Sequence, residues 1–352
     1  MPVVGGGVVL VPEALDENTL PSRLLGRDDE LARLVGTLRS PVPRNGHAWL
    51  HGPAGCGRTC LARHAIEAAG LGAVHVNCRT VQTAFRVLDA AVDQLRLLPL
   101  EFSREREVRL RALRAGLRDR RVVFLLDDAD ALHERELEYL LHGLAELPNV
   151  SVLVTAAGTG SLDAFQSRNP SHFLPLVLEV RPLGAEAMAE ALADRARVGI
   201  VEGAWSSDVM LAVARAAAGD GRLAVQALRR AANFAEFQGL RKLDERVVAT
   251  TLAELRNLRR TGLLGQLTQH HRVLFKVVCD RPGLSAGDVR REEAIAARVL
   301  NLSAIAERTI RKYLNDDLVR LGLLRVQRTG LRGNVFRYWP VDLGGGEQGA
   351  MP

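Results

Sequence analysis

The chain has 352 residues, of which 47% are hydrophobic and 25% are charged, and its formal net charge is +6. One compact core rarely serves a chain of this length, so we expect two or three globular domains. No window holds eighteen uninterrupted apolar residues, which predicts that the chain does not cross a membrane. The cysteines lack paired CxxC spacing, which argues against a zinc site or a disulfide framework and favours a cytoplasmic protein.

Both ends of the chain are predicted to lie outside the folded domains. Residues 1–17 are apolar but lack a basic segment and are interrupted by three glycines. We therefore predict a flexible lead-in rather than a signal peptide. The glycine-rich tail, residues 343–352, is predicted to be disordered.

Residues 18–182 alternate short apolar runs with longer helical patterns. Strands are expected at 47–52, 73–77, 121–128 and 149–157, with helical stretches that include 59–69, 80–97 and 131–147. Near-continuous apolar strands that alternate with helices are typical of a parallel sheet covered on both faces. The sequence therefore predicts an α/β domain here.

The stretch "WLHGPAGCGRTCLARH", residues 49–64, has the glycine spacing of a phosphate-binding P-loop. Glycine permits the loop dihedrals and lets backbone N–H groups point at phosphate oxygens, and the helix that follows adds positive potential. Thr59 is expected to bind Mg²⁺. We predict that ATP or ADP is held by Pro53, Ala54, Gly55, Cys56, Gly57, Arg58, Thr59 and Cys60.

Arg58 stands where the P-loop pattern has lysine. A guanidinium group is planar and forked, whereas an ammonium group is a compact point charge. Arginine still pairs with phosphate, but its donors need not lie where charge develops in the transition state. Nucleotide binding can therefore survive this change while hydrolysis suffers.

Two further positions near the expected γ-phosphate depart from the pattern of P-loop ATPases. The strand "VVFLLDDAD" ends in Asp127, a predicted Mg²⁺ ligand, and Asp128, which replaces the glutamate that polarises the attacking water. Aspartate is one methylene shorter, and a displacement of about 1 Å costs roughly 10²-fold in rate. Ala157 follows the fourth strand, where a polar residue normally orients water, and Thr155 carries the nearest hydroxyl. We predict Asp127 and Asp128 as the catalytic pair of an ATPase with weak or absent turnover.

Residues 183–260 contain alanine-rich amphipathic helices without a strand signal, which predicts a small all-α domain. Arg222 begins one of these helices after a Gly-Asp-Gly break. At the start of a helix, an arginine is more often an ordinary surface residue. Its place after a P-loop domain favours contact with the γ-phosphate.

Residues 261–342 hold 14 Lys and Arg against 8 Asp and Glu, a surplus equal to the net charge of the whole chain. Helices near 266–279, 285–298 and 303–321, followed by a hairpin, are the winged-helix pattern. We predict that this domain binds double-stranded DNA through Arg308, Arg311, Lys312, Arg328 and Arg332. A solvated helix and an ordinary hairpin are the alternative, which the concentrated charge disfavours.

Residues 103–121 carry eight arginines. Leu110, Leu113 and Leu117 give this segment an apolar stripe, so an exposed helix face is the simpler interpretation. A second DNA contact is the alternative hypothesis.

Together these motifs resemble the archaeal origin-recognition initiators, AAA+ ATPases akin to the eukaryotic origin-recognition and cell-division-control proteins. The resemblance covers residues 18–340 and rests on the P-loop and on "LPSRLLGRDDELARL", "VHVNCRTVQTAFRVL" with Asn77-Cys78-Arg79, "LLDDAD" and "GDGRLAVQALRRAA". It implies an AAA+ domain, a helical lid and a winged helix, with Leu24 in the segment that lies against adenine and Arg222 as the lid's sensor arginine. It makes Arg168 the nearest candidate for an inter-subunit arginine.

The resemblance further implies binding to replication origins and recruitment of a replicative helicase, beside paralogous initiators. It implies a divergent paralogue that acts in the cytoplasm at the nucleoid. A DNA-binding transcription or plasmid-maintenance regulator on the same scaffold is the alternative. The three departures disfavour an efficient motor ATPase.

Overall fold

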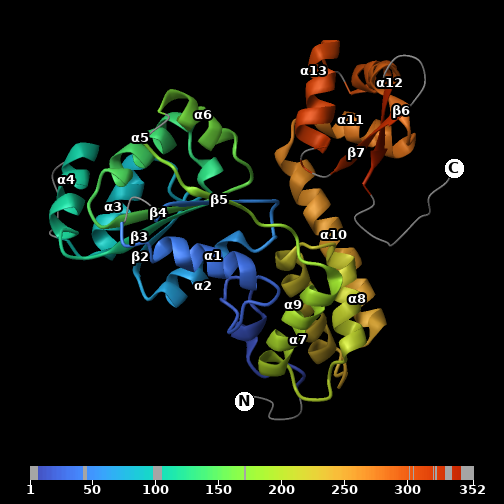
Figure 1. Ribbon diagram of the computed structural model, residues 1–352. Helices are drawn as coiled ribbons and strands as arrows, with labels where there is room; N and C mark the ends of the chain where they lie inside the picture. Colours follow the sequence, from blue (N-terminus) through green and yellow to red (C-terminus); the bar gives the residue numbers. More distant parts are fainter. Residues whose placement is uncertain are drawn as a thin grey trace. The chain divides into compact units, whose positions relative to one another are not determined.

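The computed structural model describes residues 7–42, 46–97, 105–169, 172–300, 302–303, 305–319, 321, 323–329 and 335–341 (Figure 1). The chain divides into two compact units, Met1–Val248 and Ala249–Pro352, and each has its own hydrophobic core. Among the helices of the described residues, none is long and apolar enough to cross a membrane.

Unit 1 begins with a five-stranded parallel sheet in the order β2-β3-β4-β1-β5. Its strands are β1 (Ala48–His51), β2 (Gly72–Asn77), β3 (Val122–Asp127), β4 (Val150–Ala156) and β5 (Leu176–Glu179). The sequence predicts the first four strands. The apolar signature is clearest for β3 and β4, which are buried along their whole length. It misses β5, whose position at the edge leaves three of four side chains partly or fully exposed and removes the apolar signature.

Helices cover both faces of this sheet, as predicted (Figure 1). Successive side chains of a strand point to opposite faces. Val123 and Leu125 of β3 therefore pack with α1 (Asp28–Leu38) and α2 (Arg58–Ala69). Val122, Phe124 and Leu126 pack on the other side with α3 (Ala84–Gln94), α4 (Arg106–Gly116), α5 (Glu134–Ala145) and α6 (Gly160–Arg168).

Helix α4 corresponds to the arginine-rich segment 103–121. Leu113 and Leu117 are fully buried and Leu110 packs against the same core, so the predicted apolar stripe is present. Arg109 is also buried, because it pairs with Asp89 at 2.8 Å and covers the ring of Phe85. Arg111, Arg114, Arg118 and Arg120 remain exposed.

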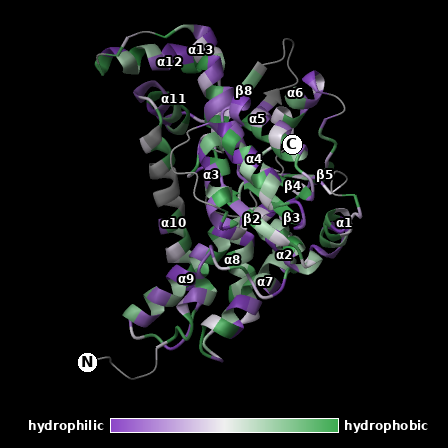
Figure 2. Ribbon diagram, turned by 90° about the vertical axis from the view of Figure 1, so that its left-hand side faces the viewer, coloured by the Kyte–Doolittle hydropathy of each residue, from purple (hydrophilic) through white to green (hydrophobic). Residues whose placement is uncertain are grey.

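The second part of unit 1 is the all-α lid, with α7 (Ala185–Gly199), α8 (Ser207–Ala217) and α9 (Gly221–Phe237). Ser206 and Asp220 cap α8 and α9 by accepting hydrogen bonds from backbone N–H groups in the first turn. Figure 2 shows hydrophilic and hydrophobic residues in turn along α9. Most of the residues that this helix buries are alanines. Helix α10 (Glu245–Gln266) begins in unit 1 and continues into unit 2.

The structure differs from the prediction of a flexible lead-in. Val8 and Leu15 are buried, and residues Pro12–Leu15 form the 3₁₀ helix η1, which packs on α7. The glycines suggested mobility, but the order comes from lid residues almost 200 positions away, which the sequence pattern does not reveal. Residues 1–6 and the predicted tail, 343–352, lie outside the described residues.

Unit 2 contains α11 (Gln269–Asp280), β6 (Leu284–Ser285), α12 (Ala286–Val299), α13 (Glu307–Lys312), β7 (Leu324–Thr329) and β8 (Val335–Pro340). Helix α13 continues as a π-helical segment, Tyr313–Val319, and the strands form an antiparallel sheet in the order β6-β8-β7. Three helices with a terminal hairpin are the arrangement of a winged helix. The two-residue strand β6 is too short for a sequence pattern to predict.

Candidate functional site

The P-loop joins β1 to α2 and approaches the lid closely. Gly55 has a φ of 77° and Gly57 a φ of 97°, values in the left-handed region that glycine adopts without strain. The Gly55 carbonyl accepts a hydrogen bond from the N–H of Gly221, at 2.9 Å. A Cβ atom on Gly55 would collide with the Asp220 carboxylate. Two properties therefore require glycine at position 55, the backbone conformation and the proximity of the lid.

A cavity of about 430 Å³ lies between the P-loop, residues 17–27 and the lid helices α7 and α9. This volume is in the range of small-molecule sites. Of the residues predicted to bind nucleotide, those that line the cavity are Leu24, Gly55, Cys56, Gly57, Arg58, Thr59, Cys60 and Arg222, and the predicted pair Asp127 and Asp128 joins them. Pro53 and Ala54 do not line it.

Sequence reasoning misses several residues of the cavity wall. They include the arginines Arg27, Arg63 and Arg195, the ring of His75, and the lid side chains Met188, Leu192 and Val225. The four-residue spacing of Met188 and Leu192 was a detectable signal of one helix face. Arg27 belongs to the segment quoted for the resemblance, and its buried guanidinium donates to the carbonyls of Cys56 and Arg181.

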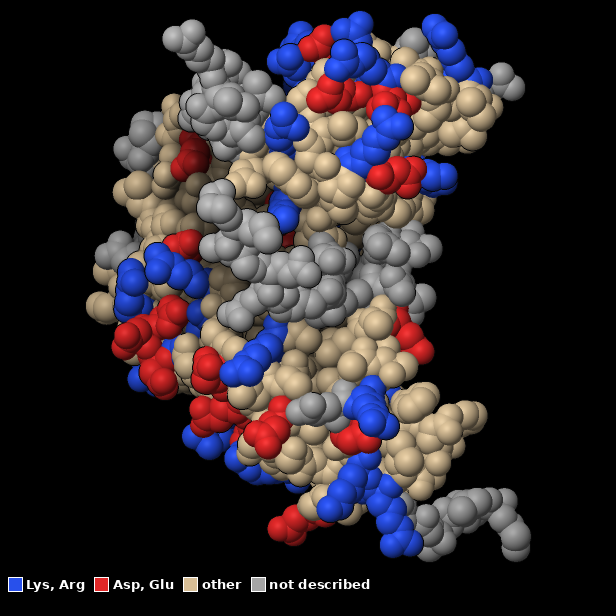
Figure 3. All heavy atoms as spheres, turned by 90° about the vertical axis from the view of Figure 1, so that its right-hand side faces the viewer, with Lys and Arg blue, Asp and Glu red and all other residues tan. Residues whose placement is uncertain are grey.

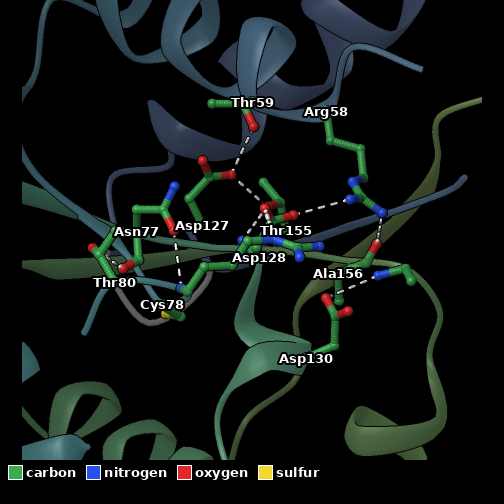
Figure 4. A network of polar contacts seen from close by, with 12 residues as sticks. Arg58, Thr59, Asn77, Cys78, Thr80, Asp127, Asp128, Asp130, Thr155 and Ala156 are labelled. Carbon is green, nitrogen blue, oxygen red and sulfur yellow. Dashed lines mark hydrogen bonds and ion pairs between the residues drawn. The ribbon is translucent and has the colours of Figure 1, made fainter. Parts of the chain in front are cut away.

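Thr59 and Asp127, the predicted Mg²⁺ ligands, are in direct contact (Figure 4). The Thr59 hydroxyl donates to Oδ1 of Asp127 at 2.8 Å, and Thr155 donates to the same oxygen at 2.6 Å. Burial raises the pKa of Asp127, but His75 and the two threonine hydroxyls outweigh burial and hold that pKa below its ordinary value. An ionised carboxylate beside a hydroxyl, at the N-terminal end of α2, fits a divalent cation and a phosphate group.

The side chain of Arg58 is buried, with 8% of its surface exposed. Its Nη1 donates to the carbonyls of Gly52 and Ala156, the second at 2.6 Å, and its Nη2 donates to Oδ1 of Asp128 at 3.1 Å (Figure 4). The guanidinium group thus connects the P-loop to β4 and to the end of β3. Most of its hydrogen-bonding capacity is used within the protein.

Asp128 is held by two arginines. Its Oδ1 accepts from Arg58, and its Oδ2 accepts from Nε of Arg79 at 2.7 Å. The hydrogen bond to Asp128 raises the pKa of Arg79. The backbone of Asp128 has a φ of 52° and its N–H donates to the Thr155 hydroxyl, at 2.9 Å. Both carboxylate oxygens therefore already accept hydrogen bonds from guanidinium groups.

Ala157 offers only its backbone to this region, where its N–H donates to Asp130 at 3.2 Å. Thr155, the nearest hydroxyl, is fully buried and bridges the Asp127 side chain and the Asp128 backbone. The Thr155 hydroxyl group therefore already makes hydrogen bonds with both aspartates.

Arg222 and Arg63 differ from Arg58. Both line the cavity and are exposed, and neither side chain makes a hydrogen bond or an ion pair with any residue that the structure describes. Arg168, the candidate inter-subunit arginine, lies on α6 and pairs with Glu134 and Glu138 of α5.

The residues predicted to bind DNA lie in unit 2. Arg308, Arg311 and Lys312 are exposed on α13, while Ile310, Leu314 and Leu318 on the opposite side are buried. The three basic residues line a shallow groove together with Thr309, Asn315 and Asp316. Arg332 and the side chain of Arg328 lie outside the described residues.

Ion pairs reduce the free positive charge of unit 2. Glu307 pairs with Arg311 at 2.7 Å and with Arg290 at 2.8 Å, and Arg281 pairs with Glu292. Figure 3 shows acidic side chains among the basic ones on the face that it presents. Exposed pairs of this kind contribute about 0–1 kcal/mol each, so a phosphate group can displace them.

A parallel sheet with a P-loop, followed by a helical lid that closes on the loop, defines an AAA+ module. A model of the AAA domain matches residues 43–164, and a model of the Cdc6 AAA+ ATPase-type lid domain matches residues 189–252. The chain belongs to the archaeal Orc1/Cdc6 family of AAA+ proteins.

Curated relatives match most of the chain. The ORC1-type DNA replication protein 15 of Haloarcula marismortui is 23% identical over 93% of this chain and 88% of its own. The ORC1-type DNA replication protein 1 of Halobacterium salinarum is 25% identical over 78% of this chain and 92% of its own.

Solved structures share the fold. The Aeropyrum pernix ORC1 protein in complex with DNA gives a TM-score of 0.70 at 22% identity, covering 96% of this chain and 94% of that one. The ORC2 protein of the same organism, in ADPNP–ADP complexes, gives a TM-score of 0.70 at 19% identity, and the match covers 95% of this chain and 94% of that one. Cdc6p from Pyrobaculum aerophilum gives 0.62 at 20% identity, covering 96% of each chain.

Proposed function

We propose that this protein is a DNA replication initiator that binds ATP or ADP with Mg²⁺, binds origin DNA through its winged helix, and hydrolyses ATP weakly or not at all. The observation that carries the proposal is the contrast between two adjacent aspartates. Asp127 is ionised and paired with Thr59 as a metal site requires, whereas both oxygens of Asp128 accept hydrogen bonds from arginines.

Nucleotide binding draws on three parts of the cavity. The P-loop N–H groups and the N-terminus of α2 attract phosphate oxygens, and Thr59 and Asp127 are the proposed Mg²⁺ ligands. Bound Mg²⁺ supplies positive charge against the phosphate oxygens. Arg222 has guanidinium donors that no described residue occupies, so it is the proposed contact for the terminal phosphate.

Weak hydrolysis follows from the state of Asp128. A general base must hold the attacking water within hydrogen-bond reach, and both oxygens of Asp128 already accept hydrogen bonds from guanidinium groups. Ala157 adds no side-chain donor for water, and Thr155 is occupied. Removal of one group that stabilises the transition state commonly costs 10²-fold or more in rate, and here several such groups are altered.

DNA binding is proposed for the exposed face of α13, with Arg308, Arg311 and Lys312, and for the wing residues Arg328 and Arg332. The solved ORC1 relative is in complex with DNA, which supports this assignment. Contacts to phosphate release counterions, so affinity for DNA should fall steeply as salt is added. A replicative helicase and paralogous initiators remain the proposed protein partners.

The proposal is tested first on the purified protein. We expect ADP or ATP to be released from it on denaturation, or to bind in calorimetry with Mg²⁺, while phosphate release stays close to background. Absence of binding at millimolar nucleotide, or turnover of many ATP per minute, would contradict the nucleotide part of the proposal.

A DNA-binding transcription or plasmid-maintenance regulator on the same scaffold is the second candidate. An Asp128 that is ion-paired with two arginines suits a ligand sensor as well as an initiator. Chromatin immunoprecipitation with footprinting separates the two functions. Protection of a replication origin supports the initiator, and protection confined to promoters supports the regulator.

A further inference from the structure

The segment before α1 crosses the lid and then forms part of the cavity wall. Val9 makes an antiparallel bridge with Ile200. The N–H of Leu10 donates to the Gly199 carbonyl at 2.8 Å, and the N–H of Val201 donates to the Val8 carbonyl at 2.9 Å. We call residues 8–21 the strap.

Side chains fix the strap to the lid at several further points. Leu15 is fully buried, and a Cβ atom on Gly199 would collide with it. Asp16 forms an ion pair with Arg229 of α9 at 2.8 Å, and Glu17 accepts from Gln226, one turn earlier, at 2.8 Å. The strap is therefore held by α7 and α9 together.

Arg195 of α7 makes the densest set of contacts with the strap. Its Nη1 donates to the carbonyls of Ala14 at 2.9 Å and Asp16 at 3.1 Å, and its Nη2 donates to the carbonyl of Thr19 at 2.7 Å. One planar guanidinium group thus fixes the path of six consecutive residues. Lysine, with a single nitrogen, could not reach three carbonyls in this arrangement.

The C-terminal part of the strap lines the cavity. Its lining residues are Glu17, Asn18, Thr19, Leu20 and Pro21. They face a cavity whose other walls are the P-loop and the lid. Beyond η1, which ends at Leu15, this backbone is held by Arg195 together with the lid contacts of Asp16 and Glu17.

We propose that the strap is an element of the lid that closes the nucleotide cavity, and that Arg195 is the positioning residue that sets its place. This inference rests on the proposed nucleotide binding and adds a determinant of affinity outside the P-loop. Because strap and lid are bonded together, nucleotide affinity should depend on contacts that lie away from the cavity, such as Leu15 under Gly199.

The test compares three variants with wild type by calorimetry with Mg-ADP. Arg195→Met and Leu15→Ala should each raise the Kd at least tenfold, and Arg195→Lys should give a smaller loss. Arg197→Met is the matched control, because Arg197 lies on the same helix but is exposed and pairs only locally with Asp194. Its Kd should equal that of wild type. Thermal unfolding checks that each variant is folded, and Leu15→Val replaces Leu15→Ala if the latter is not.

Limited trypsin digestion gives a second measurement. Arg23 is exposed directly after the strap, so release of the strap should accelerate cleavage after Arg23. Mg-ADP should protect this bond in wild type and in Arg197→Met, but not in Arg195→Met.

Each outcome decides between the two proposals. If wild type binds no nucleotide, the proposed function fails. If wild type binds and both Arg195→Met and Leu15→Ala bind equally well, the strap proposal is wrong and nucleotide binding stands. If only Arg195→Met loses affinity, Arg195 contacts the nucleotide directly and is not a positioning residue.

Discussion

The two sides of the nucleotide cavity differ in how far the protein satisfies its own polar groups. On the sheet side, Arg58 and Asp128 are buried and bonded to each other, and the buried Asp127 accepts from the Thr59 and Thr155 hydroxyls. On the side that faces the lid and solvent, Arg63 and Arg222 are exposed and make no hydrogen bond with the described part of the chain. The polar groups on the sheet side of the cavity are thus occupied, while the side chains of Arg63 and Arg222 keep donors that no described residue uses.

The difference has a physical cause. A charge that is taken out of water must be paired, or its desolvation costs several kcal/mol. Arg58 and Asp128 meet this requirement through each other, which makes them structural as well as functional. Exposed arginines keep their water and remain free for a ligand. This difference is what the proposed function requires of a site that retains a nucleotide more than it cleaves it.

The largest predicted effect follows from the buried pair. Arg58→Met leaves Asp128 with only the more exposed Arg79, and it removes the donors to the Gly52 and Ala156 carbonyls. Breaking a buried ion pair costs about 3 kcal/mol or more, which for a unit of this size lowers Tm by roughly 6–12 °C. Calorimetric unfolding measures this shift. Arg63→Met, a change of the same type at an exposed cavity residue, should leave Tm within about 2 °C; equal losses would show that burial does not distinguish the two arginines.

The second prediction concerns the contact between the P-loop and the lid. Gly55→Ala places a Cβ atom against Asp220 and forces a non-glycine residue to a φ of 77°. The conformation alone costs about 1–2 kcal/mol. Because the loop can avoid this cost only by leaving the geometry that faces the lid, the Kd for Mg-ADP should rise roughly fivefold to thirtyfold. Gly36→Ala is the control, because Gly36 lies in α1 with open space around it. Gly36→Ala should leave the affinity for Mg-ADP unchanged and stabilise the helix by about 0.5–1 kcal/mol. If the two variants bind Mg-ADP with the same Kd, the loop does not fit tightly against the lid.

The comparison also shows what could be read from the sequence. β3 and β4 were predictable because burial on both faces gives continuous apolar runs, and α4 because its leucines recur at helical spacing. The members of the P-loop site were predictable because they are adjacent or end consecutive parallel strands. The direction of the Arg58 side chain was not, since it depends on Asp128, seventy residues further along the chain.

Order in the strap was unpredictable for the same reason. Its short apolar run, preceded by three glycines, carries no periodic signal, and the contacts that fix it come from Arg195 and Arg229. Local patterns specify elements that satisfy their own hydrogen bonds. Segments that are satisfied by distant side chains require the tertiary structure.

A third prediction tests Arg222, the exposed arginine at the start of α9, whose side chain has no described hydrogen-bond partner. Arg222→Met should weaken the binding of ATP about fivefold to tenfold, as expected for one charge-assisted hydrogen bond in a partly hydrated site. The binding of ADP should be weakened less. Tm without nucleotide should not change, because Arg222 contacts no described side chain through a hydrogen bond or ion pair. Competition with a fluorescent ADP analogue measures both affinities. An equal loss for ATP and ADP would place Arg222 away from the terminal phosphate.

The smallest predicted effect is on turnover in Arg58→Lys, which restores the residue of the usual P-loop pattern. Lysine can reach phosphate, but Arg79 still donates to Asp128 at 2.7 Å and Thr155 remains bonded to Asp127. Ala157 still offers no side chain to orient water. ATP hydrolysis measured by phosphate release should therefore rise less than tenfold over wild type. A vigorous ATPase in this variant would mean that Arg58 alone suppresses hydrolysis, and that the pairing of Asp128 with Arg79 has no part in it. If the double variant Arg58→Lys, Arg79→Ala then hydrolyses ATP faster than Arg58→Lys, the second arginine is a barrier to the chemistry in its own right.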